Sequence, residues 1–223
     1  MIKENGFTVK VSLIAQARDQ LHRFDKKTVF NNPTGDFFYD PWVLKDEYVG
    51  TVWDALLNSL RLPVGEARLI ILDPGESYMA HADIDDRYHL NISGNNSFLI
   101  DLNKQKMHIL EQDGKWYDMD AGKIHTAGNY GEIPRAQLVV RKLLKRGRFF
   151  HNYLHVKITP QRDRFDYRYH FDTSISPWLN KVSKDKGIDN FKFNNNTVEF
   201  DMDSKLEDQL KEFDHDIFCI SYE

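Results

Sequence analysis

The chain has a single cysteine, Cys219, among its 223 residues, so neither a disulfide framework nor a thiolate zinc site can form within one chain. Long apolar runs are also missing, since no stretch approaches the roughly 18 residues that a membrane-spanning helix needs. The start of the sequence lacks the basic and then apolar pattern of a signal peptide. These absences predict a cytoplasmic protein of a reducing compartment, with no membrane partner.

A strong charge of either sign is missing as well. The 30 Lys and Arg residues nearly balance the 34 Asp and Glu residues, which gives a formal net charge of −4. This balance argues against non-specific binding of polyanions, so we expect no nucleic-acid partner. The length allows one large or two small domains with a substantial core. The composition specifies no oligomeric state.

The first two thirds of the chain change from helical to β patterning. Residues 7–64 hold an alternating apolar start, a helical stretch ending near Phe24 and a second helix over 52–60. Short β runs separated by turn residues follow, which is typical of an antiparallel sandwich or barrel. The expected strands are 67–72, 88–92, 97–101, 106–111, 115–119 and 136–144, and the expected turns are 73–75, 94–96, 113–114, 121–122 and 128–129.

We therefore predict a mainly β fold with α/β additions. Its core, residues 66–144, is expected to be a double-stranded β-helix of the jelly-roll or cupin-like type. The N-terminal helices are expected to buttress this core, which together with them forms a domain over residues 1–145.

The last third of the chain has a different order of elements. The pattern predicts strand 153–158, helix 177–186, strands 191–193 and 197–202, helix 204–213 and strand 217–222. This βαββαβ order is the ferredoxin-like arrangement. It indicates a small C-terminal α+β block over residues 146–223, although the same segments are compatible with an elaboration wrapped on the sandwich.

The motif that carries chemistry is His81-Ala82-Asp83, with His125 following 44 residues after His81. Residues i and i+2 of an extended strand point to the same side, so His81 and Asp83 can converge on one point. A histidine from a neighbouring strand completes a 2-His-1-carboxylate facial triad, which leaves open positions on iron. The competing interpretation is chance, because nine histidines in an Asp-rich chain often produce such a pattern.

Three further residues predict an anion site beside this triad. Arg135 heads the last strand of the β region, and its guanidinium can clamp a carboxylate of a dicarboxylic cosubstrate. Arg87 and His89 share one strand face, and burying them without a partner is costly. The alternatives are that Arg135 is an ordinary strand-edge arginine, that Arg87 pairs with Asp85 or Asp86, and that His89 faces solvent.

Three segments carry a resemblance to a known family: 72–83, 86–90 and 120–135. Together they resemble the catalytic core of the aspartyl/asparaginyl β-hydroxylase-like family of Fe(II)- and 2-oxoglutarate-dependent oxygenases, which includes bacterial free-proline hydroxylases. The resemblance covers residues 66–144. It implies that His81, Asp83 and His125 bind Fe(II), that Arg135 binds the C5 carboxylate of 2-oxoglutarate, and that Arg87 and His89 contribute to the cosubstrate pocket.

The resemblance also implies a reaction. A dioxygenase of this kind uses O2 and 2-oxoglutarate to hydroxylate an unactivated C–H bond of an amino acid or peptidyl residue, and releases succinate and CO2. Its partner would be a small-molecule or peptide substrate. Two alternatives stay open: a non-catalytic jelly-roll protein that binds a small anion, and a cupin-like metalloenzyme that does not use 2-oxoglutarate. The environment of Arg135 distinguishes these alternatives, because an ion pair between Arg135 and a protein carboxylate would leave no pocket for 2-oxoglutarate.

Overall fold

The structure, a computed structural model, describes residues 1–147, 152–161, 167–194, 196–213 and 216–222. Its largest sheet is antiparallel, with six strands in the order β1 (Ile2–Thr8), β9 (Lys115–Met119), β6 (Arg87–Ser93), β11 (Arg135–Arg141), β5 (Ala67–Leu72) and β2 (Lys27–Val29). A second sheet has the order β10 (His125–Asn129), β7 (Ser97–Asp101) and β8 (Lys106–His108). Residues 77–81 join the free edge of β10 through bridges from Ser77 to Gly128 and from His81 to His125.

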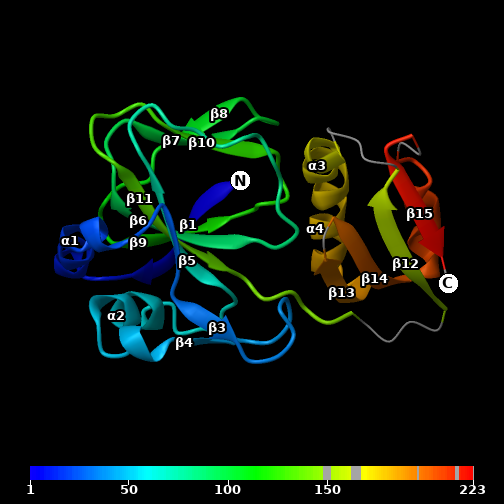
Figure 1. The fold of residues 1–223 in the computed structure, drawn as a ribbon, viewed down its shortest axis with the longest axis horizontal. Coiled ribbons are helices and arrows are strands. Elements are labelled where there is room, and N and C mark those ends of the chain that lie inside the picture. Colours follow the sequence, from blue (N-terminus) through cyan, green and yellow to red (C-terminus); the bar gives the residue numbers. More distant parts are fainter. Residues whose placement is uncertain (148–151, 162–166, 195, 214–215, 223) are drawn as a thin grey trace.

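These strands form the predicted jelly roll (Figure 1). One sheet carries the order β5-β11-β6-β9, and the other carries segment 77–81, then β10, β7 and β8. This is the strand order of an eight-stranded jelly roll. The predicted turn at 128–129 is wrong: Gly128 and Asn129 belong to β10, where they pair with Phe98 and Ser97. The pairing with β7 overrides the turn preference of Gly-Asn.

The N-terminal helices α1 (Val11–Asp19) and α2 (Val52–Asn58) cover the outer face of the large sheet, as expected of a buttress. Buried apolar residues of both helices meet those of the sheet strands, and the fully buried ones include Trp53, Leu56, Leu69, Leu90 and Leu138. Burying each such side chain contributes roughly 1.5–3 kcal/mol. The strands β3 (Asn31–Pro33) and β4 (Trp42–Leu44) form an antiparallel hairpin, and Leu44 packs against the same core.

The inner face of the same sheet carries several polar side chains. Because side chains alternate along a strand, Leu69, Leu90 and Leu138 face the helices while their neighbours face the second sheet. Those inward-facing neighbours are Arg68, Arg87, His89 and Gln137. Part of the space between the two sheets is therefore a cavity with polar lining, and Leu99, Tyr117 and Met119 form an apolar cluster beside it.

The C-terminal elements have the predicted βαββαβ order. They are β12 (Tyr153–Pro160), α3 (Tyr167–His170), the π-helical η3 (Phe171–Ile175), α4 (Ser176–Lys184), β13 (Ile188–Asn194), β14 (Thr197–Asp203), α5 (Glu207–Leu210) and β15 (Phe218–Tyr222). The antiparallel sheet order β13-β14-β12-β15 is that of a ferredoxin-like fold, and the segment has its own apolar core. The domain boundary at residue 145 stays a prediction.

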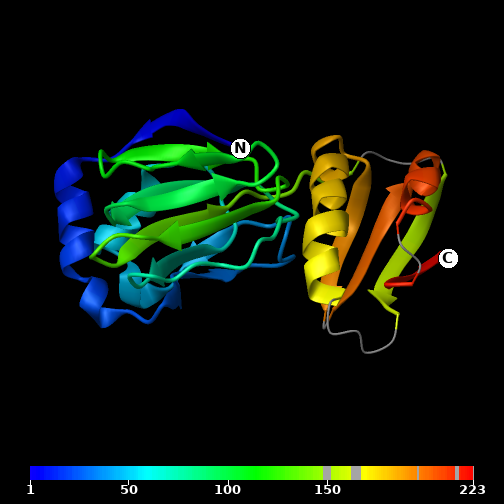
Figure 2. The same cartoon turned by 90° about the horizontal axis from the view of Figure 1, so that it is seen from above.

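The continuous helix formed by α3, η3 and α4 lies between the C-terminal sheet and the jelly roll (Figures 1 and 2). Lys184 of α4 forms ion pairs with Asp86 at 3.0 Å and Asp120 at 2.7 Å. Asn180 donates to Asp86 at 3.1 Å, and Gly122 approaches Asn180 so closely that a Cβ at Gly122 would lie 2.4 Å from the Asn180 Cγ. None of the described helices is long and apolar enough to cross a membrane; the cytoplasmic location stays a prediction.

Candidate metal centre

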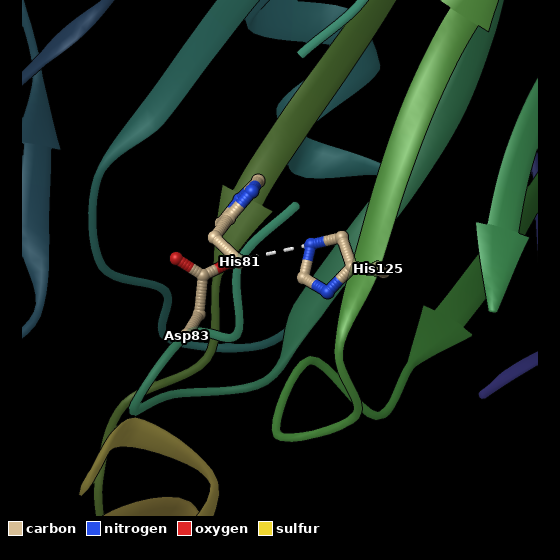
Figure 3. A group of neighbouring side chains, drawn as sticks. All are labelled: His81, Asp83 and His125. Carbon is tan, nitrogen blue, oxygen red and sulfur yellow. Dashed lines mark ion pairs between the residues drawn. The ribbon is translucent and has the colours of Figure 1, made fainter. Parts of the chain in front are cut away.

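His81, Asp83 and His125 converge between the two sheets (Figure 3), with one candidate ligand atom from each lying within 4.8 Å of the others. His81 and His125 exchange two backbone hydrogen bonds, of 2.9 and 2.8 Å, which place their side chains on the same side. Asp83 follows in a loop rather than in a regular strand, and its N–H donates to the Ala121 carbonyl at 2.8 Å. Loop hydrogen bonds thus replace the strand alternation that the sequence predicts.

Both histidine rings are held in place by a backbone carbonyl. The Nδ1–H of His81 donates to the Met79 carbonyl at 2.9 Å, and the Nδ1–H of His125 donates to the Lys123 carbonyl at 2.7 Å. Carbonyl oxygens only accept, so each Nε2 keeps its lone pair. Metal-binding histidines usually tie the second ring nitrogen in this way.

The donor set fits Fe(II), because two imidazoles and one carboxylate form a facial triad. The ligands of a facial triad are mutually cis, so at about 2.1 Å from one ion they lie about 3 Å apart. The three side chains must therefore move closer together when a metal binds. The His125 Nε2 and Asp83 Oδ2 atoms, 3.9 Å apart, must approach by about 1 Å.

Arg87 holds the Asp83 carboxylate in place. Its guanidinium pairs with Asp83 Oδ1 at 3.0 Å and with Asp85 Oδ1 at 2.6 Å, and Asp85 also pairs with Arg141. Burial is the largest single effect and acts to raise the pKa of Asp83, but the charges around it, Arg87 first, together outweigh burial and lower this pKa to about 2. Asp83 is consequently ionised at neutral pH, with Oδ2 turned toward His125.

Arg135 lies in the same cavity, of about 50 Å³, and is 2% exposed. No carboxylate among the described residues forms an ion pair with it, and its Nε has no hydrogen-bond partner. Tyr78 is its polar neighbour, and burial lowers the pKa of Arg135. The condition that would remove an anion pocket, a buried ion pair of Arg135, is therefore not met within the described ranges.

His89 is buried rather than solvent-facing. Its Nδ1 contacts the Gln137 side-chain oxygen at 2.9 Å, and its Nε2 has no partner. Burial lowers the pKa of His89 to about 3 and that of His125 to about 4, so both rings are neutral at pH 7.

Buried polar atoms without a hydrogen-bond partner concentrate in this cavity. Of the seven such side-chain atoms among the described residues, five belong to residues that line it: Arg68 Nε, Tyr78 Oη, Arg87 Nε, His89 Nε2 and Arg135 Nε. Leaving a polar group buried and unpaired costs about 1–3 kcal/mol, so such a cluster indicates a polar ligand.

The structure brings all six predicted site residues into one cavity, and it adds residues that sequence reasoning missed. Arg68 and Tyr78 line the cavity, and Asp85 and Arg141 support Arg87. Arg68 was detectable in principle, because it interrupts the apolar strand 67–72 at an inward position. The roles of His81, Asp83, His125, Arg135, Arg87 and His89 toward iron and cosubstrate stay predictions.

No protein-family model matches the sequence, and no curated protein sequence matches it. Solved structures give distant likenesses. AviO1 from Streptomyces viridochromogenes Tue57 has a TM-score of 0.43 at 13% identity, covering 63% of this chain and 88% of that one. A Pseudomonas putida prolyl-4-hydroxylase has a TM-score of 0.41 at 16% identity, covering 64% and 92%. EctD from S. alaskensis with 2-oxoglutarate and 5-hydroxyectoine has a TM-score of 0.39 at 12% identity, covering 64% and 71%. Membership of the aspartyl/asparaginyl β-hydroxylase-like family stays a prediction.

Proposed function

We propose that the chain is an Fe(II)- and 2-oxoglutarate-dependent dioxygenase that hydroxylates an unactivated C–H bond of an amino acid or peptidyl residue. The observation that carries this proposal is the cluster of unpartnered buried polar atoms beside the His81, Asp83 and His125 triad. A metal ion alone would not provide hydrogen-bond partners for these atoms. A dicarboxylate bound beside the metal would provide them.

The charges in the cavity favour an anion. Three guanidinium groups, from Arg68, Arg87 and Arg135, line it together with a single carboxylate, Asp83. Arg87 is neutralised by Asp83 and Asp85, whereas Arg135 has no counter-charge in the described part of the chain. A buried, uncompensated guanidinium is costly, and a bidentate carboxylate is its natural partner.

Each residue then has a task. His81, Asp83 and His125 would hold Fe(II), and Arg135 with the Tyr78 hydroxyl would bind the distal carboxylate of 2-oxoglutarate. Arg87 orients Asp83 through the pair at 3.0 Å. When bound, iron with 2-oxoglutarate and O2 supplies the oxidation, with succinate and CO2 as co-products. The protein positions these groups and excludes water from them.

The proposal is tested by succinate release. Purified protein with Fe(II), 2-oxoglutarate and O2 should release succinate slowly without substrate, and the Zn(II)-loaded protein should release none. Substituting Arg135→Met should lower the rate at least tenfold at a fixed subsaturating 2-oxoglutarate concentration. Metal binding without succinate release would favour a cupin-like enzyme that does not use 2-oxoglutarate, and no metal binding would favour a non-catalytic anion-binding protein.

A further inference from the structure

A cleft of about 490 Å³ adjoins the metal-site cavity. Its walls come from β2 and β5, from the segment that leads into His81, and from α3 and η3 of the C-terminal block. The cavity and the cleft share four lining residues: Arg68, Ile70, Tyr78 and His81. A molecule in the cleft would therefore lie next to the candidate metal ligands.

Basic side chains outnumber acidic ones in this cleft. The basic lining residues are Lys26, Lys27, Arg68 and Arg168, and the acidic ones are Glu76 and Asp172. Three of the basic residues are already in ion pairs: Lys26 with Asp73 and Glu76, Arg68 with Glu66, and Arg168 with Asp172. Lys27 is exposed and has no ion pair within the described ranges. An anionic ligand can therefore be bound here by Lys27 and by the terminal amino groups of Arg168, whose ion pair with Asp172 uses Nε.

Arg168 is the basic residue best placed to bind that ligand. Its Nε donates to Asp172 Oδ2 at 2.8 Å, one helical turn away, and its guanidinium lies 5.5 Å from the centre of the Phe193 ring. These contacts fix the side chain, which is still 61% exposed. The terminal amino groups of the fork are the usual donors to a carboxylate.

The cleft also has an apolar surface. Met79 and Tyr169 are 75% and 49% exposed at its rim, and Ile70 and Ile71 lie in its wall. Exposed apolar side chains beside a cavity that has a few polar groups are typical of small-molecule sites, whose volumes are about 300–1,000 Å³. The cleft falls within this size range.

We propose that this cleft binds the substrate, and that the substrate is a small carboxylic acid with an apolar body. Its carboxylate pairs with Arg168, its apolar body lies on Met79 and Tyr169, and the carbon to be hydroxylated points toward His81. The identification of this ligand as the substrate rests on the proposed function, but its binding does not. The C-terminal block thereby contributes directly to substrate selection.

Isothermal titration calorimetry with matched probes tests the proposal. N-acetyl-leucine, N-acetyl-methionine and N-acetyl-phenylalanine are each titrated as the free acid and as the primary amide, which has nearly the same shape but no charge. The full chain is used metal-free and also loaded anaerobically with Fe(II) and 2-oxoglutarate. We expect at least one acid to bind three- to tenfold more tightly than its amide.

Two variants distinguish the two parts of the cleft. Arg168→Gln should reduce the ratio of acid affinity to amide affinity to less than twofold. Tyr169→Ala should weaken the binding of the acid and of the amide by the same factor. Arg23→Gln, an exposed arginine outside the cleft, serves as the matched control and should change neither. Absence of acid binding, equal binding of acid and amide, or a preference that survives Arg168→Gln would overturn the proposal.

The outcomes separate this inference from the proposed function. If the metal-free protein prefers the acid but does not bind 2-oxoglutarate, the proposed acid-binding cleft is supported and the proposed dioxygenase function is rejected. If the protein binds 2-oxoglutarate but shows no preference for the acid, the proposed acid-binding cleft is rejected and the proposed dioxygenase function is supported.

Discussion

The backbone N–H of Ala82 donates to the carbonyl of Asp172 at 2.8 Å. This bond joins the residue between the candidate ligands His81 and Asp83 to the π-helical turn η3 of the C-terminal block. Within η3 the i→i−4 hydrogen-bond ladder is interrupted, and such turns are frequent at functional sites. The geometry of the candidate metal centre therefore depends on how the C-terminal helix docks against the jelly roll.

Docking can be perturbed at Gly122. A Cβ there would lie 2.4 Å from the Asn180 Cγ, so Gly122→Ala must displace either α4 or the loop whose Ala121 carbonyl binds Asp83. We expect a loss of about 1–3 kcal/mol in the free energy of unfolding and weaker Fe(II) binding. Urea denaturation and metal titration measure the two effects. In an Asn180→Ala background, Gly122→Ala should lower the free energy of unfolding by less than it does in the wild-type chain. An equal loss would argue against the close contact between Gly122 and Asn180.

Removing a candidate ligand should abolish metal binding without unfolding the chain. His81 is only partly buried and its ring bonds one backbone carbonyl, so His81→Ala leaves no buried partner stranded. We expect Fe(II) affinity to fall at least 100-fold with an unchanged circular dichroism spectrum. His22→Ala, at an exposed position, is the control. Wild-type iron affinity in the His81 variant would make the ligand assignment wrong.

Arg135 should show opposite effects on binding and on stability. Its charge is buried without a carboxylate partner in the described part of the chain, so Arg135→Met removes an unfavourable burial and fills a similar volume. We expect the free energy of unfolding of the metal-free variant, measured by thermal denaturation, to exceed that of the wild-type chain by about 1–3 kcal/mol. Binding of 2-oxoglutarate should be lost. A destabilised variant would indicate that Arg135 serves the fold rather than a ligand.

The metal-free protein should lose stability in mild acid. The pKa of His89 is lowered to about 3 and that of His125 to about 4, whereas in the unfolded chain both take up protons near 6.5. Between these values the unfolded state binds more protons, so stability rises with pH and falls as the pH drops below about 6.5. Each group contributes a slope of up to about 1.4 kcal/mol per pH unit.

Urea denaturation at pH values from 7.5 to 4.5 measures this slope. Substituting His89→Gln should reduce it by about half, because only His125 then contributes. A slope that is unchanged in the variant would show that His89 is not a buried neutral imidazole.

Periodicity in the sequence predicts much of the fold. Alternation places Arg87 and His89 on one face of β6, and the structure confirms it, because period-2 geometry is local. The order of the C-terminal elements follows from equally local signals. The turn predicted at Gly128-Asn129 is wrong because strand pairing with β7, a contact distant in sequence, determines that segment.

The site was predictable as a set of residues but not as a network. The sequence places His81, Asp83 and His125 together through a resemblance, whereas the ion pairs of Arg87 with Asp83 and Asp85 depend on side-chain geometry. The contact of Ala82 with Asp172 joins two segments that no local pattern connects. Such long-range contacts are set by packing and leave no signal in periodicity.

The most direct test of the account is an anaerobic titration of the metal-free protein with Fe(II) and then with 2-oxoglutarate, followed by visible absorption. Chelation of the iron by 2-oxoglutarate produces a metal-to-ligand charge-transfer band. We predict that this band appears for the wild-type chain and is absent for Arg135→Met at the same 2-oxoglutarate concentration. Bound iron without a band in the wild-type chain would contradict the assignment of this cavity as a 2-oxoglutarate site.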